Sequence, residues 1–590
     1  MKGTHSPTGH RRGGPGRLLG LVVALIAALG LTGTAAFAAP AHKDASAALG
    51  SKAPSSKALS PMSAVAAMQP SWNLGNSLDA IPDETSWGNP AVTKALLDTI
   101  KAQGFRSVRI PVTWSGHQSA TAPYTIDATW MNRVKQVVDW AQADGLYVVL
   151  NVHHDSWQWI SSMATDHDNV LARFKATWTQ VAAKFRDSSQ TLLLESNNEP
   201  QFNNTTDAQG IQYNDELNIA FHTVVRQSGG NNATRLLVLP TLHTNSGQTF
   251  LDALAGEMKS FNDPNLVVTV HYYGYYPFSV NVAGGTRFDA TSQQDMTDNF
   301  DRLRATFTSK GIPVYLGEYG LLAYPDSNHP SRVERGEAFK YFEQFGYEAR
   351  TAGVTTALWD PGTFAYLSRS TLQWTDSELI NRIRSSWTTR SGTASSDQVF
   401  LTKSSAITAQ TLTLNPDGLT FRGLWQGTTQ LAQGRDYTVS GNQLTLTAST
   451  LTRLAGNRAY GTNATIEARF SAGLAWPIRV ITYDRPVLSN ATGSTGGLTI
   501  PTQYRGDQLA TMESTYADGT NAGNTDWTPY QEFNGAFSPD YANNALTLTP
   551  DYLNALRDGA PVSLTFHFWS GATVTYHVTK SGSSVTGTVG

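Results

Sequence analysis

Short apolar runs alternate with amphipathic helical patterns throughout residues 62–388, and few folds accommodate this order. Eight runs have the composition of buried strands, and they begin at or near Trp72, Val108, Tyr147, Leu192, Leu236, Leu266, Val314 and Thr356. Helical patterns, such as residues 92–103 and 130–143, separate these runs. Because parallel strands need a crossover connection that is usually a helix, the order predicts an α/β fold, a (β/α)8 TIM barrel.

Polar and aromatic side chains collect at the C-terminal ends of these runs. Nine such residues are Arg109, His153, His154, Asn198, Glu199, His271, Tyr273, Glu318 and Trp359. The C-terminal ends of the strands form the rim that carries the active site in barrel enzymes. We therefore expect these side chains, from six different strands, to converge on one site.

Two glutamates in this set point to a particular chemistry. Glu199 lies in Asn198-Glu199-Pro200, which follows the fourth apolar run, and Glu318 ends the seventh. Burial of a carboxylate costs free energy unless the group is paired or has a chemical role. Strands 4 and 7 face each other across a barrel, so we expect the two carboxyl groups to converge. Such a pair can cut glycosidic bonds.

The chain changes character after residue 388. A polar linker, residues 388–397, leads into a segment rich in Thr, Gly and Asn with short alternating runs that are typical of half-buried strands. The pattern of residues 442–447 recurs at residues 544–549. The sequence therefore predicts two small, related all-β sandwich domains, at residues 398–486 and 487–583.

The N-terminal segment predicts export. Three arginines precede the apolar stretch of residues 18–31, and Ala36-Phe37-Ala38 then offers small residues for cleavage. This pattern indicates a signal peptide, residues 1–38, since about 20 apolar residues are needed to span a membrane. Residues 39–61 are rich in Ala, Ser and Lys and predict a flexible spacer. We expect a secreted, extracellular protein that is not embedded in a membrane.

Composition excludes several classes of function. The formal net charge of −3 argues against nucleic acid as the main partner. The chain has no cysteine, so it has no disulfide, thiolate metal site or cysteine nucleophile. The 15 tryptophans suit sugar binding, because a flat ring covers the apolar face of a pyranose.

Seven motifs occur in an order that resembles a known family. They are Trp72 to Asp79, Trp87 to Pro90, Gly104 to Trp114, Asn151 to Asp155, Asn198 to Pro200, His271 to Tyr273, and Gly317-Glu318. Together they resemble glycoside hydrolase family 5 (cellulase family A), and Trp87-Gly88-Asn89-Pro90 is similar to its subfamily 4 endoglucanases. The two C-terminal repeats resemble X2-type immunoglobulin-like modules, chiefly through residues 434–441.

The resemblance implies a secreted, retaining endo-β-1,4-glucanase that hydrolyses cellulose or related β-glucans by double displacement. It implies that Glu199 is the proton donor and then the base, and that Glu318 is the nucleophile. We expect burial and the neighbouring carboxylate to raise the pKa of Glu199. Arg109 would keep Glu318 ionised, and Tyr273 would donate a hydrogen bond to it.

Further residues are candidates for binding or support. We expect the amide of Asn198 to reach the sugar 2-OH, and Asn73 to bond sugar hydroxyls. One of His153 and His154, together with His271, would bond the sugar or the glutamates. Trp359 would stack on the sugar or cover the core. Four aromatic residues on predicted loops are candidates for lining a cleft: Trp87, Trp114, Trp157 and Tyr276.

Other activities stay open at this point. Adjacent histidines point to opposite sides of a strand, so we expect no metal at His153 and His154, and no cofactor. Xyloglucan, mixed-linkage glucan and mannan are alternative substrates. A non-catalytic carbohydrate-binding protein is the alternative from another class. We expect a monomer. Its C-terminal modules either contact insoluble polysaccharide or a cell wall, or only space the enzyme, and we expect most of their aromatic residues in the module cores.

Overall fold

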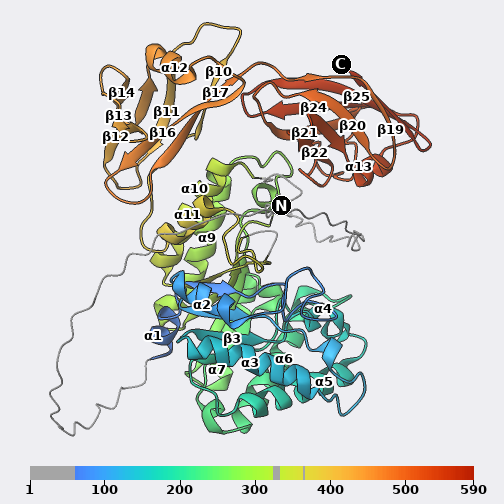
Figure 1. Cartoon of the computed structure of the whole chain (residues 1–590). Helices are drawn as coiled ribbons and strands as arrows, with labels where there is room; N and C mark the ends of the chain where they lie inside the picture. The colour runs from blue at the N-terminus through green and yellow to red at the C-terminus, as the bar shows by residue number, and fades with distance from the viewer. Residues whose placement is uncertain (1–59, 323–332, 363–365) are drawn as a thin grey trace, which may run out of the picture. The chain divides into compact units, whose positions relative to one another are not determined.

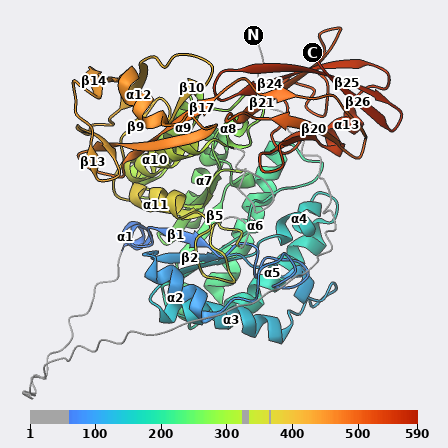
Figure 2. The same ribbon diagram turned by 45° about the horizontal axis from the view of Figure 1, so that its top comes forward.

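The computed structural model describes residues 60–322, 333–362 and 366–590. The predicted signal peptide and nearly all of the predicted spacer lie outside these residues. Eight parallel strands pair in chain order and close into a barrel (Figures 1 and 2). The strands are β1 (Ser71–Asn73), β2 (Ser107–Ile110), β3 (Tyr147–Asn151), β4 (Leu192–Glu195), β5 (Leu237–Pro240), β6 (Leu266–Tyr272), β7 (Val314–Tyr319) and β8 (Thr355–Leu358). The predicted (β/α)8 barrel is confirmed.

Helices surround the strands (Figure 1). The longer ones are α2 (Lys94–Ala102), α3 (Ala128–Ala143), α5 (His167–Phe185), α6 (Asp207–Gln227), α7 (Gln248–Phe261), α9 (Ala290–Thr306), α10 (Arg335–Ala352) and α11 (Ser377–Ser386). Shorter ones are α1 (Pro61–Ala66), α4 (Asp155–Gln158) and α8 (Tyr276–Ser279). Side-chain caps start many of them; Asp127, for example, accepts from the N–H of Trp130 in α3. Gly353 ends α10 in the left-handed conformation (φ 68°).

Alternation along the strands decides which side chains enter the barrel. Val149, Leu193 and Val267 lie in an inner cluster, which Val65 and Met68 close at the end near α1. The residues on either side of them on the strands pack outward in the main core beneath the helices. Since side chains alternate with a period of two, residues two positions later on the same strands also face inward, closer to the rim.

Strand β4 is shorter than the apolar pattern indicated. It ends at Glu195 rather than at Glu199. The chain then turns, and Glu199 adopts a left-handed backbone conformation with φ of 40°. Non-glycine residues rarely adopt this conformation, and such residues are concentrated at functional sites.

Two all-β modules follow the barrel, as predicted. The first has a five-stranded sheet of β10 (Gln398–Thr402), β17 (Trp476–Tyr483), β16 (Gly461–Phe470), β12 (Phe421–Gln426) and β13 (Thr429–Gln430). Its four-stranded sheet contains β14 (Tyr437–Ser440), β15 (Gln443–Leu446), β11 (Gln410–Asn415) and β9 (Thr393–Ala394).

The second module repeats this arrangement of two sheets. Its four-stranded sheet contains β18 (Val487–Leu488), β20 (Leu498–Gln503), β23 (Ala545–Leu548) and β22 (Phe537–Asp540). Its five-stranded sheet contains β19 (Ala491–Ser494), β26 (Ser584–Val589), β25 (Thr573–Ser581), β24 (Pro561–Phe568) and β21 (Leu509–Tyr516). The sequence repeat corresponds to β15 followed by α12 (Ala448–Ala455), and to β23 followed by α13 (Pro550–Ala555).

The two modules differ in how they are packed. Buried residues of the first module belong to the same hydrophobic cluster as the barrel, and Trp476 meets Phe339 of α10 edge-on at 6.5 Å. The second module has a core of its own. Tyr437, Trp476 and Tyr516 are buried, as expected for module aromatics, whereas Trp527 is 56% exposed.

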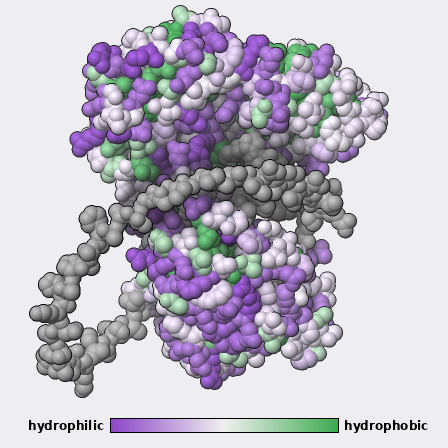
Figure 3. Space-filling view, viewed as in Figure 1, coloured by the Kyte–Doolittle hydropathy of each residue, from purple (hydrophilic) through white to green (hydrophobic). Residues whose placement is uncertain are grey.

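Polar residues cover much of the face that is visible in Figure 3, with apolar residues scattered between them. Within the described ranges, no helix has the length and apolar character required to cross a membrane.

Candidate active site

Arg109 is the centre of the candidate active site. Its side chain is fully buried inside the barrel and donates to four side chains. Nε and Nη2 bind both oxygens of Glu195 at 2.7 Å, and Nη1 binds Glu318 Oε1 at 2.8 Å. Nη1 also binds Asn73 Oδ1 at 3.0 Å, and Nη2 binds Asn198 Oδ1 at 2.7 Å. Burial lowers the pKa of Arg109, but the charges of Glu195 and Glu318 raise it by a larger amount. The net shift is upward, so the guanidinium stays charged.

Glu318 is held on both of its oxygens. Arg109 occupies Oε1, and the Tyr273 hydroxyl donates to Oε2 at 2.6 Å. The side chain is 6% exposed. The structure thus brings both predicted partners to this carboxylate. Charge-assisted bonds of this kind fix the orientation of the carboxylate.

Glu199 lies in the turn beyond β4 and is the more open of the two glutamates. Its side chain is 46% exposed, and its Oε1 lies 2.9 Å from Nδ1 of His271. The same nitrogen lies 3.5 Å from Glu318 Oε2. One oxygen of each glutamate and a nitrogen of His271 all lie within 4.8 Å of one another. Retaining glycosidases hold their two carboxyl groups about 5–5.5 Å apart.

The pKa of Glu199 is lower than the ordinary value of a glutamate, which corrects the expectation that it is raised. Burial does raise it, but the hydrogen bond and electrostatic attraction of His271, together with the charge of Arg109, lower it by more. Neighbouring cations therefore outweigh the effect of burial in the free enzyme.

Asn73 does not face the substrate side of the rim, contrary to prediction. Its side chain is fully buried, and Nδ2 donates to the carbonyl of Gly317 at 2.9 Å. Nδ2 also lies 3.3 Å from the carbonyls of Ala357 and Leu358, while Oδ1 accepts from Arg109. Both ends of the amide are used inside the barrel, so Asn73 supports Arg109 instead of binding sugar.

Comparison with known proteins agrees with this geometry. The family model described as cellulase (glycosyl hydrolase family 5) matches residues 74–363. The models for carbohydrate binding domain X2 and for a carbohydrate binding domain named CBM46 match residues 393–480 and 484–588. Endoglucanase B of Paenibacillus lautus is 46% identical over 575 residues, which cover 97% of this chain and 98% of that protein.

The chain belongs to glycosyl hydrolase family 5.

Two solved structures have the same modular organisation. The full-length tri-modular endo-beta-1,4-glucanase B of Bacillus halodurans is 42% identical with a TM-score of 0.87, covering 90% of this chain and all of that one. A tri-modular subfamily 4 enzyme of Bacillus licheniformis, solved with cellotetraose, is 30% identical with a TM-score of 0.75, covering 88% and 99%. This family 5 chain is therefore an endoglucanase-type hydrolase. We expected both modules to be of X2 type, but the second matches CBM46.

The two adjacent histidines of this family 5 enzyme are not on a strand. Strand β3 ends at Asn151, and the rings of His153 and His154 lie 4.5 Å apart. The expectation that they point to opposite sides is therefore wrong. Burial lowers the pKa of His153 well below its ordinary value, and the nearby charge of Arg109 adds to this effect, so the neutral imidazole is favoured. His154 is the more exposed ring, and its Nδ1 accepts from Trp157 Nε1 at 2.9 Å.

Two groups of side chains have the spacing of metal ligands. Among the described residues these are Asp79, His153 and His154, and Glu199, His271 and Glu318. Backbone N–H groups already bind both oxygens of Asp79, at 3.1 and 2.8 Å. Arg109 and Tyr273 occupy both oxygens of Glu318. Protein donors thus already occupy both oxygens of Asp79 and both oxygens of Glu318.

The aromatic residues at the rim divide into two groups. Trp87 and Tyr276 are exposed. Trp114 is fully buried and donates to the carbonyl of Asn151, so its predicted place in a cleft is wrong. Trp359 is 9% exposed and lies parallel to the ring of His153, with 5.8 Å between centroids.

Glu195 is a site residue that the sequence interpretation missed. It forms the two-pronged ion pair with Arg109 and also accepts from Asn151 Nδ2 at 3.2 Å. The alternation of side chains along β4 could have indicated that Glu195 faces into the barrel, because Leu193 faces inward and Glu195 follows it by two positions.

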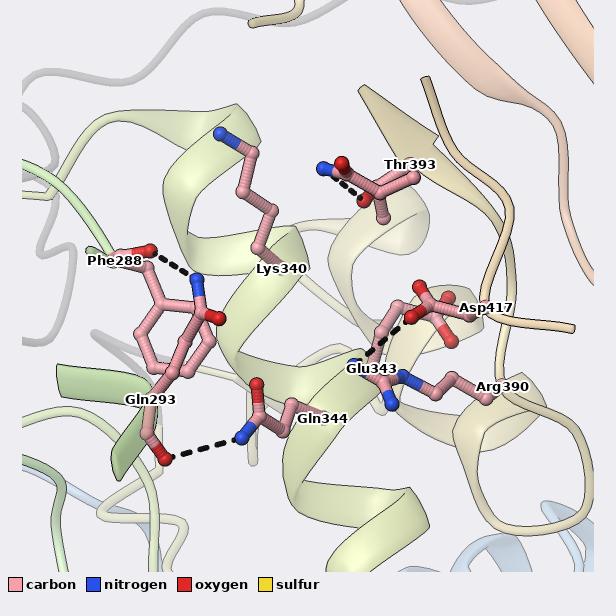
Figure 4. Close-up of a pocket in the computed structure, with 9 residues that line it drawn as sticks. Phe288, Gln293, Lys340, Glu343, Gln344, Arg390, Thr393 and Asp417 are labelled. Carbon is pink, nitrogen blue, oxygen red and sulfur yellow. Dashed lines mark hydrogen bonds and ion pairs between the residues drawn. The ribbon is translucent and has the colours of Figure 1, made fainter. Parts of the chain in front are cut away.

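A separate polar cavity is not part of this site. It has a volume of about 250 Å³ and lies where α10 meets the first module (Figure 4). Its lining residues are Phe288, Gln293, Lys340, Glu343, Gln344, Arg390, Thr393, Asn415 and Asp417. Glu343 is paired with Arg382 at 3.1 Å, and Asp417 with Arg390 at 3.2 Å. These charges are already balanced, and no lining residue belongs to the strand-end set.

Proposed function

We propose that the barrel hydrolyses β-1,4-glucans with retention of anomeric configuration, with Glu318 as nucleophile and Glu199 as acid/base. The observation that carries this proposal is the contrast between two close carboxylates. Glu318 is buried and fixed by Arg109 and Tyr273, as an attacking group must be. Glu199 is half exposed and pairs with His271, so protons can reach it.

The reaction would follow two steps. A Glu318 oxygen attacks the anomeric carbon while Glu199 protonates the leaving glycosidic oxygen, which forms a glycosyl-enzyme and releases one saccharide. Water then attacks the same carbon, Glu199 takes its proton, and the bond to Glu318 breaks. Arg109 holds the Oδ1 end of Asn198, which leaves its NH2 group as the end that can donate to the sugar 2-OH.

In the free enzyme, the low pKa of Glu199 suits its role as the base of the second step. Its role as the acid of the first step requires a higher pKa. A low pKa favours a general base, whereas the acid must carry a proton. A bound glucan would cover the exposed side of the carboxylate and exclude water, which raises the pKa of a carboxyl group. We infer that substrate binding itself supplies the protonated form.

Substitution of the two glutamates tests the roles. Glu318→Gln is expected to lose roughly 10⁴-fold or more of kcat on every substrate, because no nucleophile remains. Glu199→Gln is expected to lose roughly 10²- to 10⁴-fold of kcat/KM on polysaccharide, but much less of kcat/KM on a dinitrophenyl cellobioside, because kcat/KM reports the first step and this leaving group needs no proton. Glu216→Gln, a substitution on α6 outside the rim, is the matched control. Proton NMR of the first sugar released should show the β anomer; an initial α anomer would contradict retention.

A substrate panel tests the choice of glucan. Relatives of the same modular organisation are named endo-β-1,4-glucanases, and one was solved with cellotetraose. We propose soluble cellulose derivatives and cello-oligosaccharides as good substrates. Equal or higher kcat/KM on xyloglucan, mixed-linkage glucan or mannan would move the assignment to that alternative. Binding without hydrolysis by the wild type would favour a non-catalytic carbohydrate-binding protein.

We also propose that the enzyme is secreted as a monomer after removal of residues 1–38. The basic, apolar and small-residue segments of the N-terminus support this proposal. Mature protein from the culture medium should begin at Ala39 and should elute from a sizing column at the mass of one chain.

The two modules are proposed to hold the enzyme on insoluble polysaccharide or a cell wall. Their matches to carbohydrate-binding domains and the exposed indole of Trp527 support this role. Trp527→Ala is expected to weaken pull-down on insoluble cellulose and to leave kcat on soluble cellotetraose unchanged.

A further inference from the structure

The loop between β6 and α9 connects the candidate nucleophile with the second module. It comprises residues 273–289 and includes the short helix α8. It begins at Tyr273, whose hydroxyl donates to Glu318. Its middle contacts the second module, because Nδ2 of Asn281 donates to the carbonyl of Ala510 in β21. The orientation of Tyr273 can therefore depend on a domain that contributes nothing to the barrel.

Ser279 secures the inner half of the loop. Its hydroxyl donates to the carbonyl of Tyr273 at 2.5 Å and accepts from the N–H of Leu322 at 2.8 Å. Leu322 lies just after β7, the strand that carries Glu318. This bridge connects the backbone of Tyr273 to the exit of the nucleophile's own strand.

Asn281 secures the outer half of the loop to the second module. It is 2% exposed and has a left-handed backbone conformation with φ of 51°. Its Nδ2 donates to the carbonyl of Ala510 at 3.0 Å, and its own carbonyl accepts from the N–H of Phe533 at 3.1 Å. Ala510 lies at an irregularity in the pairing of β21 with β24, which releases its carbonyl from the regular ladder.

The loop can pass a displacement from the second module to Tyr273 because hydrogen bonds and tight packing join its own turns. Backbone bonds link Ser279 to Tyr275, Asn281 to Phe278, and Val282 to Pro277, at 2.9–3.2 Å. A Cβ on Gly285 would lie 2.4 Å from the carbonyl of Pro277, so the turns touch without spare space. Tight packing of this kind transmits displacement.

Two aromatic contacts support the same docking. The backbone of Gly284 packs against the ring of Tyr530, and the guanidinium of Arg287 lies 4.8 Å from the ring of Trp569. An arginine over an indole contributes cation–π attraction. The module thus touches the loop at Asn281, Gly284 and Arg287.

We propose that Asn281 is a positioning residue through which the second module fixes the loop that aims the Tyr273 hydroxyl at Glu318. The module thereby has a role in the chemical step itself, separate from carbohydrate binding. The proposal rests on the proposed role of Glu318 as nucleophile. It predicts that loss of the Asn281 side chain lowers kcat even on a substrate too short to reach a carbohydrate-binding module.

The test is a double-substitution cycle in the full chain with an aryl β-cellobioside. Asn281→Gly keeps the left-handed backbone accessible and removes only the side chain, while Asn281→Ala adds backbone strain. Both variants are expected to lower kcat about tenfold with KM nearly unchanged. Tyr273→Phe should lower kcat by at least as much. The pair Asn281→Gly with Tyr273→Phe should be no slower than Tyr273→Phe alone, because Asn281 acts through that hydroxyl.

Asn262→Gly is the matched control. Asn262 caps the C-terminus of α7 with the same left-handed conformation, φ of 48°, and precedes the N-terminal end of β6, the end of the strand opposite the rim. Its kcat should equal that of the wild type.

Three results would overturn the inference. The first is a wild-type kcat in Asn281→Gly. The second is a higher KM in Asn281→Gly without a loss of kcat. The third is a loss of kcat in the double variant that equals the product of the losses in the two single variants. If Tyr273→Phe itself kept full activity, the role proposed for Glu318 and its hydrogen bond would fail first. Loss in Tyr273→Phe with full activity in Asn281→Gly would remove only the present inference.

Discussion

At the scale of single residues, Arg109 decides the charge balance of the barrel interior. Lys cannot replace its planar fork, because an ammonium group cannot bind both oxygens of Glu195 and also reach Glu318 and Asn198. Arg109→Lys is therefore expected to leave buried carboxylate oxygens unpaired. We expect a loss of about 3–5 kcal/mol in the free energy of unfolding, measured with urea, and a loss of roughly 10²-fold or more in kcat/KM.

Arg133→Lys provides the control for this substitution. Arg133 also binds two carboxylate oxygens, those of Glu84 at 2.9 and 2.7 Å, but it lies at the partly exposed surface. We expect a change of about 1 kcal/mol or less and normal activity. Equal losses in the two variants would contradict the central role of Arg109.

His271 sets the pH dependence of the candidate acid/base. Burial raises the pKa of Glu199, and His271 is the strongest of the groups that lower it. His271→Ala removes both the hydrogen bond and the charge, so the pKa of Glu199 rises and the proton is retained to higher pH. The basic limb of the kcat/KM profile should move to higher pH, although kcat falls because the carboxylate loses an orienting partner.

His167→Ala is the control for the pH profile. His167 is a half-exposed histidine on α5 that pairs with Glu216. Its substitution should leave both limbs in place. A basic limb that moves to lower pH in His271→Ala would contradict the sign of the effect.

Sequence patterns placed the strand-end residues but not all their contacts. Arg109, Tyr273 and Glu318 were predicted together, because each ends a strand and the ends of barrel strands meet. Asn73 was assigned to sugar because it also ends a strand, yet its partners are carbonyls of β7 and β8. Those partners are more than 200 residues away in the chain, so local spacing contains no sign of them. Glu195 does not stand out in the sequence, because the leucines before it do not show which positions of the strand face into the barrel.

At the scale of elements, the start of α10 contains a buried charge cluster. Glu334 caps this helix and pairs with Arg479, which also pairs with Asp397. Burial and the charge of Asp397 raise the pKa of Glu334 to about 8, although Arg479 opposes this. An unfolded glutamate titrates at about 4.3. The folded state therefore holds a proton that the unfolded state has released, and this group's contribution to stability falls as pH rises from about 4.3 to 8.

Glu334→Gln tests this dependence, because the amide still caps the helix but does not ionise. The melting temperature of the variant should fall less than that of the wild type between pH 5 and pH 8. Glu378→Gln changes an exposed partner of Arg335 and should keep the wild-type slope. A steeper fall in Glu334→Gln would show that the charge on Glu334 stabilises the junction.

Helix and strand positions were predicted well, and the end of β4 was not. An apolar run followed by polar residues predicts a strand up to Glu199, but the backbone turns after Glu195. The turn depends on the left-handed conformation of Glu199, which glycine or asparagine normally marks in a sequence. Glutamate provides no such signal, so the turn was not predictable from residue types.

At the scale of the whole molecule, the repeat predicted two similar modules but not their different attachment. The first shares a hydrophobic cluster with the barrel, and Arg382 of α11 donates to its Ala475 carbonyl at 2.8 Å. The second has a separate core and meets the barrel through the loop at Asn281. Surface contacts between domains leave no periodic pattern in a sequence, whereas the strands of each module do.

Equivalent core leucines in the two modules test this difference. Leu444 of β15 and Leu546 of β23 occupy the same place in the repeat, and both are fully buried. Each Leu→Ala substitution should cost about 2–5 kcal/mol within its own module. Because the first module shares its core with the barrel, Leu444→Ala should lower the temperature of the barrel transition in calorimetry. Leu546→Ala should lower only a separate transition.

The barrel transition can be identified by its ligand. Under the proposed function, cellotetraose should bind the folded catalytic domain of the inactive Glu318→Gln variant, and by mass action it should raise the temperature of that transition. If Leu444→Ala moved a transition that the ligand does not affect, the first module would unfold independently despite the shared cluster. If both leucine variants moved the ligand-sensitive transition equally, the second module would be coupled to the barrel through the Asn281 loop more strongly than its separate core indicates.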